Sequence, residues 1–498
     1  MFKKIWKICA VPFVIILSKI SCFVFDALLG SYYGAGIVSD AFLMAYSLPT
    51  ILFEGIATAI LTCYIPIYNS FKCKEPEKIN DFSSNIFNIS LIFGIIISVL
   101  FIIFRKVILG IYAHGFSREA VRLLNDYAVI IIWSIPFIAS YSIFRAYLQI
   151  QNAKAISAIA QVVSYVVLIT ALLLTFPSDI KLAWAAVMGH MVSFGVLLLF
   201  AFGKGFKYRP VLFLRQDYLK TMAIMIIPVF VSSVVSEVNS VADKFFASHY
   251  EAGIITSMTY GYKLSFSIQG IVSSSLVIIA YSSFTEKAAQ NDMVGLNSQL
   301  YKCIQIVSWT VFPLVIGGTV IAGPIIQLVY GHGNFSGNSV NITATIFSVY
   351  LLGVMPMCMK HIGDRICCAL QRTDLAMYTA LITVGVNILL DIVMSKRMGY
   401  IGLVWATGIA ILAGSIAVFI MLKAVDNILS LRRVAKELIR PFILSLIMGI
   451  CVWGIQEALS KTRLCYVNNG LFDVIICIFT GAIVYLGTSL ILYKRKQV

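Results

Sequence analysis

Lysine residues inside apolar stretches are the first feature of this sequence that could do chemistry. Lys19 and Lys263 each lie in a run of mainly apolar residues long enough to cross a membrane. An ionisable side chain there costs roughly 2.5–3.5 kcal/mol to insert, so it usually faces a hydrated cavity or a partner. Two ammonium groups facing one hydrated cleft would suit an anionic group such as a diphosphate, for which lysine is a compact point charge.

Acidic residues in the same stretches offer a second interpretation, in which the cations form internal ion pairs. Asp26 follows Lys19 by about two helical turns and would lie on the same helix face. Glu237 and Lys244 share a face in the same way, and Asp243 precedes Lys244. We interpret Glu237, Asp243 and Lys244 as candidate ion-coupling or cavity pairs.

Two more carboxyl groups complete the predicted substrate-binding set of Lys19, Lys263, Asp26, Asp40 and Glu54. Asp40 stands at the expected start of a helix, where an N-cap is its simplest role. Glu54 lies inside the same helix, where cavity exposure and a helix–helix hydrogen bond are equally compatible with the sequence.

Other polar residues in or near the apolar runs have local explanations. Lys360, Asp364 and Arg365 stand near a helix end, which favours a local ion pair or snorkelling. Asp391 is expected at the membrane interface, and His332 in a turn. The eleven cysteines and five histidines show no metal-ligand spacing, so no metal or other cofactor is predicted.

Composition indicates the elements that position these residues. The chain has 498 residues, 60% of them hydrophobic and 12% charged, with a mean hydropathy of +0.93. Soluble domains carry about twice that charge. We therefore predict an all-α polytopic membrane protein of about fourteen transmembrane helices, near 8–30, 41–68, 82–104, 124–150, 154–176, 180–202, 218–248, 256–284, 300–322, 340–364, 373–394, 399–422, 438–458 and 470–493.

The charged residues outside these runs predict orientation and exclude some functions. Most of the 38 Lys and Arg residues fall on the side of the N-terminus, which places both termini in the cytosol. The net charge of +16 has this cause, because the basic residues form no stripe for nucleic acid. No loop is long enough to form a domain, so function must lie between the helices. No nucleotide-binding motif is present, so ATP is not the direct drive.

An internal repeat predicts how the helices are grouped. The segment 26–37 aligns with 243–254 at half of its positions, and Pro136, Arg145 and Gln151 recur in the same order as Pro356, Arg365 and Gln371. We predict a six-helix lobe at 1–203, a second lobe at 204–424, and two appended helices at 425–498. An even number of helices per repeat gives parallel pseudo-twofold symmetry, as in transporters that rock two lobes to alternate access.

The stretch Ser18-Lys19-Ile20, Asp26, Gly34-Ala-Gly-Ile-Val-Ser-Asp40-Ala-Phe42, Leu48-Pro49, Glu54-Gly55 resembles the MurJ (MviN) lipid II flippase family of the MOP superfamily. The resemblance implies a V-shaped two-lobe transporter of the bacterial cytoplasmic membrane. It would flip an undecaprenyl-diphosphate-linked precursor, most simply lipid II, outward, driven by membrane potential or an ion gradient. The last two helices would form a groove for the lipid tail, and a monomer is expected.

The resemblance also assigns roles and shows departures. Lys19 and Lys263 stand where the family has essential arginines, and Asp40 matches a family aspartate. Phe25 replaces a second arginine, and an arginine pair is missing from 50–53. Another lipid-linked oligosaccharide, such as a capsule, teichoic-acid or O-antigen unit, is therefore an alternative cargo. A MATE-type drug exporter is a further alternative, but it would favour acidic groups. A membrane-embedded glycan polymerase would need a large outer loop or a carboxylate-rich helix end.

Overall fold

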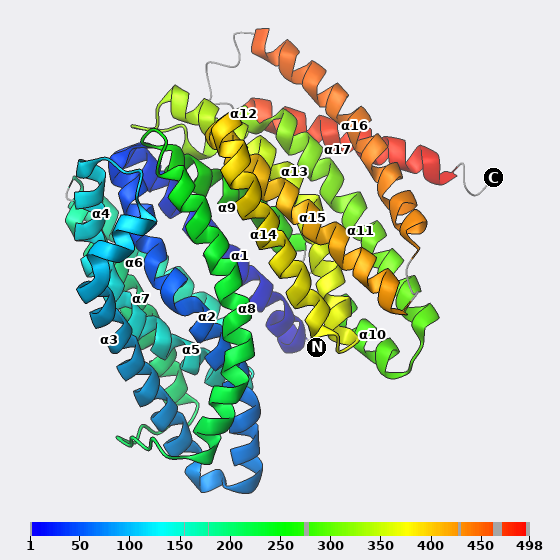
Figure 1. The fold of residues 1–498 in the computed structure, drawn as a ribbon. Helices are drawn as coiled ribbons and strands as arrows, with labels where there is room; N and C mark the ends of the chain where they lie inside the picture. The colour runs from blue at the N-terminus through cyan, green and yellow to red at the C-terminus, as the bar shows by residue number, and fades with distance from the viewer. Residues whose placement is uncertain are drawn as a thin grey trace. The chain divides into compact units, whose positions relative to one another are not determined.

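The computed structural model describes residues 2–153, 155–177, 179–272, 278–426, 430–461 and 471–494. Every regular element in these ranges is a helix (Figure 1). The predicted all-α fold class is therefore confirmed. The chain divides into two compact units, residues 1–255 and 256–498, which are described separately below.

The first unit contains eight α-helices and two short 3-10 segments. They are α1 (Phe2–Tyr33), α2 (Ile37–Lys74), η1 (Pro76–Lys78), α3 (Ile79–Tyr112), α4 (Arg118–Ile131), η2 (Ile132–Ser134), α5 (Ile135–Ile150), α6 (Ala155–Thr175), α7 (Asp179–Gly203) and α8 (Asp217–Ala247). The predicted span 124–150 is thus α4 and α5 joined through η2. Pro136 is near the start of α5, where its missing N–H is tolerated.

The second unit begins in the first turn of α9 and is also entirely helical where it is described. Its helices are α9 (Ile254–Val272), α10 (Ile278–Ala289), α11 (Met293–Val320), α12 (Ala322–Tyr330), α13 (Gly337–Ala369), α14 (Thr373–Met398), α15 (Tyr400–Asp426), α16 (Leu431–Lys461) and α17 (Leu471–Lys494). The short helix α12, which the sequence did not predict, separates α11 from the predicted turn at 331–333.

Length and apolar composition identify eleven membrane spans among the described residues, or twelve if α2 is one bent span. α2 bends by 44° between Phe53 and Gly55. The other two predicted spans, 218–248 and 256–284, correspond to α8 and to α9 with α10; residues 273–277 lie outside the described ranges. The count of fourteen stays a prediction.

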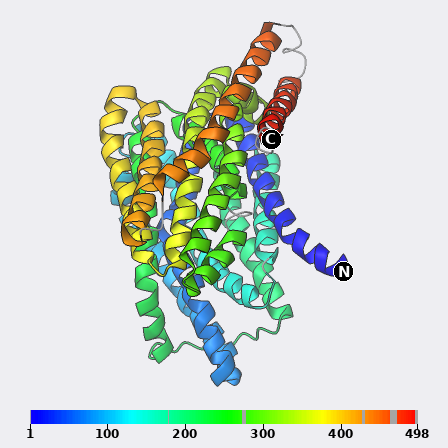
Figure 2. The ribbon, with the colours of Figure 1, turned by 90° about the vertical axis from the view of Figure 1, so that its right-hand side faces the viewer.

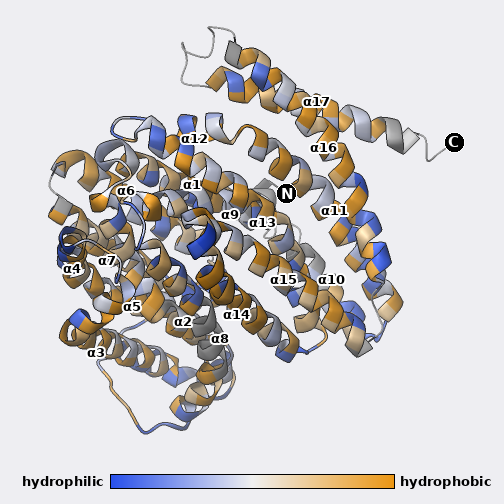
Figure 3. Cartoon of the chain, turned by 45° about the horizontal axis from the view of Figure 1, so that its top comes forward, coloured by the Kyte–Doolittle hydropathy of each residue, from blue (hydrophilic) through white to orange (hydrophobic). Residues whose placement is uncertain are grey.

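The helix surfaces show why this chain needs a bilayer. Hydrophobic residues run along most of the length of helices such as α3 and α14, while hydrophilic residues gather at helix ends and connections (Figure 3). Large apolar side chains on α3 remain open over several turns, from Ile92, 42% exposed, to Ile111, 62% exposed. A continuous apolar surface of this length is stable only against lipid tails.

Corresponding helices pack alike inside the two units. α3–α5, α5–α7 and α6–α7 are in contact in the first unit, and α11–α13, α13–α15 and α14–α15 in the second. The ends of α5 in the first unit and of α13 in the second unit are also alike. Asn152 and Gln371 have left-handed φ angles of 56° and 59°, and the next N–H bonds the carbonyl five residues back at 2.8 Å in both. This likeness supports the repeat.

The last two helices, α16 and α17, pack on the second unit, whereas α8 packs on the first. α16 contacts α11 and α17, through buried residues that include Leu444, Met448 and Val452. α8 packs along α2 and so belongs to the first compact unit, although its sequence begins the second repeat. The predicted boundaries at 203/204 and 424/425 describe sequence repeats and stay a prediction.

Candidate functional site

Lys19 lies on an open part of α1. The neighbouring Ile15, Ile16 and Ile20 are 44%, 48% and 51% exposed, and Lys19 is exposed as well. In Figure 2 the beginning of α1 extends away from the other helices of the first unit. Lys19 makes no hydrogen bond or ion pair with the described residues. Its ammonium group is therefore open, and its predicted contact with an anionic substrate stays a prediction.

Asp26 is completely buried although it shares the helix face of Lys19. Its carboxylate lies 3.8 Å from the Cys22 thiol, and its exposed fraction is 0%. The adjacent Phe25 ring packs against Phe42 and Tyr165, with ring centroids 6.2 and 6.3 Å apart. Asp26 thus lies inside the packing of the first unit, whereas Lys19 is exposed.

The predicted N-cap role of Asp40 is wrong. α2 begins at Ile37 with Gly36 as its N-cap residue, so Asp40 lies one turn inside the helix. Its carboxylate accepts a hydrogen bond of 2.6 Å from the backbone N–H of Gly253, and the side chain is 3% exposed. Asp40 therefore ties the start of α2 to the α8–α9 connection instead of capping its own helix.

Two turns related by the internal repeat meet at this point. Gly36 and Gly253 occupy equivalent positions in the repeat, and Gly253 has φ +96°, a conformation that suits glycine. A Cβ atom on Gly253 would lie 2.5 Å from the carbonyl oxygen of Ala35, whereas one on Gly36 would meet nothing within 4 Å. The close approach thus requires glycine at only one of the two equivalent positions.

The remaining predicted site residues lie on three helices. Glu54 is in α2, and its side chain lies outside the described residues. Glu237, Asp243 and Lys244 are half-buried on α8, where Asn239 donates to Asp243 at 3.4 Å.

Lys263 is half-buried on α9, and its backbone carbonyl accepts a 2.6 Å bond from the Ser267 hydroxyl, one turn later. Lys19 and Lys263 belong to different units. Their joint contact with one anion stays a prediction.

The expected ion pair on α13 is confirmed. The Lys360 ammonium lies 2.8 Å from the Asp364 carboxylate, one helical turn away. Asp364 also accepts a long bond of 3.5 Å from Thr379 on α14, and Arg365 lies 5.7 Å from the centre of the Tyr281 ring. Lys360 is therefore neutralised locally and is not a free cation for substrate.

Asp391 is buried within the second unit, and its predicted place at the membrane interface stays a prediction. Asp391 is 0% and Asn387 1% exposed. The Asn387 amide donates to the Asp391 carboxylate at 2.9 Å on the same face of α14. Sequence reasoning missed Asn387, although an Asn and an Asp four residues apart in an apolar run already indicate one polar helix face. A fully buried carboxyl in a membrane span is a functional candidate.

His332 has the predicted turn role. Its ring contacts the Leu328 carbonyl oxygen at 2.9 Å, in the turn between α12 and α13. Among the residues that the structure describes, no group of three or more His, Cys, Asp or Glu side chains could hold a metal ion.

Comparisons with known proteins show which family this sequence and fold resemble. The family model described as lipid II flippase MurJ matches residues 29–467. A probable lipid II flippase MurJ of Thermotoga maritima is 25% identical over 413 residues, covering 82% of this chain and 83% of the relative.

Solved structures agree with that match. A lipid II flippase MurJ in an inward closed conformation is similar with a TM-score of 0.83 and 23% identity, covering 99% of this chain and 100% of that one. An inward-facing MATE family multidrug transporter of the MOP superfamily has a TM-score of 0.66 and 14% identity, over 85% of this chain and 94% of that one. The chain belongs to the lipid II flippase MurJ family.

Proposed function

We propose that this protein is a flippase that moves lipid II, an undecaprenyl-diphosphate-linked cell-wall precursor, from the inner to the outer leaflet of the bacterial cytoplasmic membrane. Membership of the MurJ family supports the activity. The observation that carries the substrate class is Lys19, an exposed ammonium without a described partner among the exposed isoleucines of α1. Such a group is stabilised by an anionic ligand that reaches membrane depth, and a lipid-linked diphosphate is one.

The proposed residue roles follow from charge and burial. Lys19 and Lys263 contact the diphosphate, and the glycan occupies hydrated space while the lipid tail stays in the bilayer. Asp40 holds the turn at Gly253, which supports a structural role beside the predicted substrate contact. The proposed cycle opens the binding groups first to the inner and then to the outer leaflet, with no covalent chemistry.

One observation favours a second cargo. Phe25 stands where the resemblance expects an arginine, and its ring is buried against Phe42 and Tyr165. A buried aromatic ring cannot take the place of a phosphate-binding cation. Another polyprenyl-diphosphate-linked glycan, such as a capsule, teichoic-acid or O-antigen unit, is therefore the second candidate. A cation exporter of the MATE type fits less well, because the open ionisable group on α1 is basic.

Rescue of bacteria depleted of their own lipid II flippase tests the proposal. We expect the wild-type chain to restore growth and cell shape, and to increase the exposure of lipid II on the outer leaflet. Depletion of a capsule or teichoic-acid flippase in parallel distinguishes the two cargoes. Normal membrane expression with no rescue of lipid II exposure would contradict lipid II as the cargo.

Asp391 is the group through which we propose that a cation gradient acts. It is a fully buried carboxyl beside Asn387 in a membrane span, and a carboxyl in such a place is typical of ion and proton pathways in transporters. We expect Asp391→Asn to reduce gradient-stimulated flipping by at least about tenfold, an effect of about 1.4 kcal/mol, while lipid II binding persists.

The measurement is flipping of fluorescent lipid II in vesicles with and without an imposed cation gradient. Asp374→Asn is the matched control, because Asp374 is on the same helix but its side chain is 44% exposed. Equal gradient stimulation in wild type and Asp391→Asn would rule out this role.

A further inference from the structure

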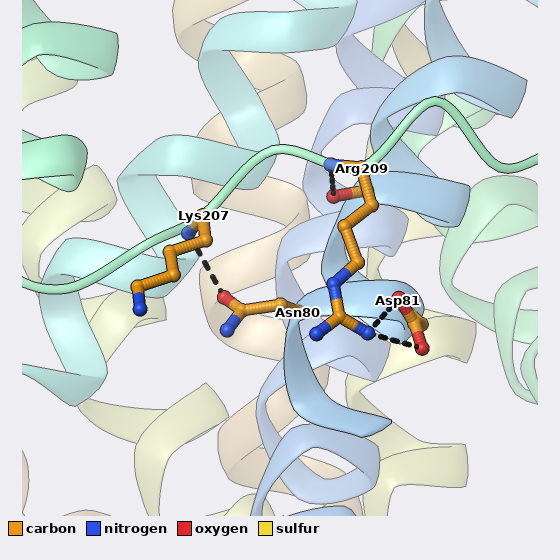
Figure 4. Close-up of polar contacts among 5 residues, drawn as sticks. Asn80, Asp81, Lys207 and Arg209 are labelled. Carbon is orange, nitrogen blue, oxygen red and sulfur yellow. Dashed lines mark hydrogen bonds and ion pairs between the residues drawn. The ribbon is translucent and has the colours of Figure 1, made fainter. Parts of the chain in front are cut away.

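The connection between α7 and α8, residues 204–216, is an extended segment fastened to the start of α3; we call it the strap. The Arg209 guanidinium donates to both carboxylate oxygens of Asp81, at 2.8 and 2.9 Å. The backbone N–H of Lys207 donates to the Asn80 side chain at 3.0 Å (Figure 4). The strap is thus attached to the first turn of α3 by side-chain and backbone bonds.

Two asparagines fasten the rest of the strap through its backbone. Asn85, which is 0% exposed, accepts from the N–H of Phe213 at 2.7 Å and donates to its carbonyl at 2.9 Å. Asn88 donates to the carbonyl of Val211 at 2.8 Å. These asparagine side chains bond backbone groups of the strap that would be bonded by a neighbouring strand in a sheet. The strap is therefore a fixed element of the first unit, with one side held by α3.

The other side of the strap is both apolar and basic. Leu212, Phe213 and Leu214 are 50%, 46% and 70% exposed. The strap contains the basic residues Lys204, Lys207, Arg209 and Arg215 and no acidic residue. In Figure 4 the ammonium of Lys207 points away from Asn80 and Asp81. Apolar side chains interleaved with cations suit a surface that offers both acyl chains and negative charge.

The level of the strap on α3 matches the edge of a bilayer. The α3 residues that hold the strap run from Asn80 to Asn88, and the open apolar side chains of α3 start at Ile92. At 1.5 Å per residue, Asn88 and Ile92 are separated by about 6 Å along the helix. The strap comes nearest to this apolar surface at Val211, which bonds Asn88. Its exposed Leu212 and Leu214 are thus next to acyl chains, with the basic residues at head-group depth.

We propose that the strap is a binding surface for anionic phospholipid, with Leu212 and Leu214 in the acyl region and Lys204, Lys207 and Arg215 on lipid phosphates. Each such basic residue strengthens association with an anionic surface by about fivefold. Arg209 is excluded from this set because Asp81 neutralises it. The surface is independent of the substrate and of the flipping activity, so either proposal can fail without the other.

Thermal unfolding of the full-length protein in micelles tests the surface. Phosphatidylglycerol should stabilise the wild type more than phosphatidylcholine does, and less at high salt. In the triple variant Lys204→Gln/Lys207→Gln/Arg215→Gln, the concentration of phosphatidylglycerol that gives half of the maximal stabilisation should rise at least about tenfold. Lys396→Gln/Arg397→Gln, on exposed residues at the end of α14, is the matched control and should behave as wild type. An unchanged lipid response in the strap variant would overturn the proposal.

A second measurement does not depend on the stability of that variant. Leu214→Trp adds an indole at a strap position that is 70% exposed, beside the six native tryptophans. The emission of this indole is obtained as the difference between the variant and the wild type in reconstituted vesicles. Brominated phosphatidylglycerol should quench this difference signal about twofold more than brominated phosphatidylcholine at equal content, because local enrichment of the anionic lipid brings more bromine to the strap. Equal quenching by the two lipids would refute a preference for anionic lipid.

Discussion

Lys19→Ala is expected to abolish rescue of cells depleted of their lipid II flippase, and Lys19→Arg to retain it. Lys19 is open and has no described partner on α1, so the loss of its charge removes a contact to substrate without breaking an internal bond. A charge-assisted hydrogen bond contributes about 1.5–3 kcal/mol, which corresponds to a loss of about tenfold to a hundredfold in substrate binding. Arginine keeps the charge and adds a fork for phosphate.

The matched control is Lys181→Ala, which removes another exposed lysine of the first unit, on α7. It should leave rescue and membrane expression at wild-type levels. Binding of lipid II to purified protein gives a readout that growth does not. Normal lipid II affinity in Lys19→Ala would show that Lys19 is not a substrate contact.

Lys263→Ala extends the same measurement into a double-mutant cycle. If Lys19 and Lys263 contact one diphosphate, the loss in the double variant will differ from the sum of the two single losses by more than about 0.5 kcal/mol. Additive losses would mean that the two lysines act at independent places. The cycle thus tests the shared anion that the sequence predicts.

The helices of this fold could be predicted from the sequence because the bilayer imposes one strong constraint on each of them. An apolar run such as 82–104 has no other stable environment, and α3 contains it entirely. The prediction of helix boundaries was less accurate where an apolar run contains a break or where a helix is too short to cross the membrane. The span at 124–150 proved to be two helices around η2, and α12 was missed because nine residues are too few to register as a span.

The side-chain roles were harder to predict because burial depends on the neighbouring helix. Lys19 and Asp26 share a helix face in sequence, yet one is exposed and the other fully buried. Tyr165 of α6 packs against Phe25, next to Asp26. Asp40 was assigned to its own helix end because its partner, Gly253, is far along the chain. The strap was missed for the same reason: the bonds of Asn85 and Asn88 to it join distant segments.

Glycine 253 shows how such a distant contact constrains one residue. Its equivalent in the first repeat, Gly36, has an extended φ of −164° and open space at its Cβ position, whereas Gly253 has φ +96° and lies against Ala35. The sequence repeat alone would treat the two glycines alike. Their different surroundings make them a matched pair for mutation.

We expect Gly253→Ala to destabilise the first unit and Gly36→Ala to be nearly neutral. The left-handed conformation costs alanine about 1–2 kcal/mol, and the added methyl group would push the Gly253 N–H away from Asp40, losing about 1.5–3 kcal/mol more. The apparent midpoint of thermal unfolding should fall by about 5–10 °C in Gly253→Ala and by less than about 3 °C in Gly36→Ala. Asp40→Asn, which keeps an acceptor oxygen for the Gly253 N–H, should fall between them. Equal midpoints for both glycine variants would show that the turn relaxes around the methyl group, and that the Asp40–Gly253 bond does not hold it.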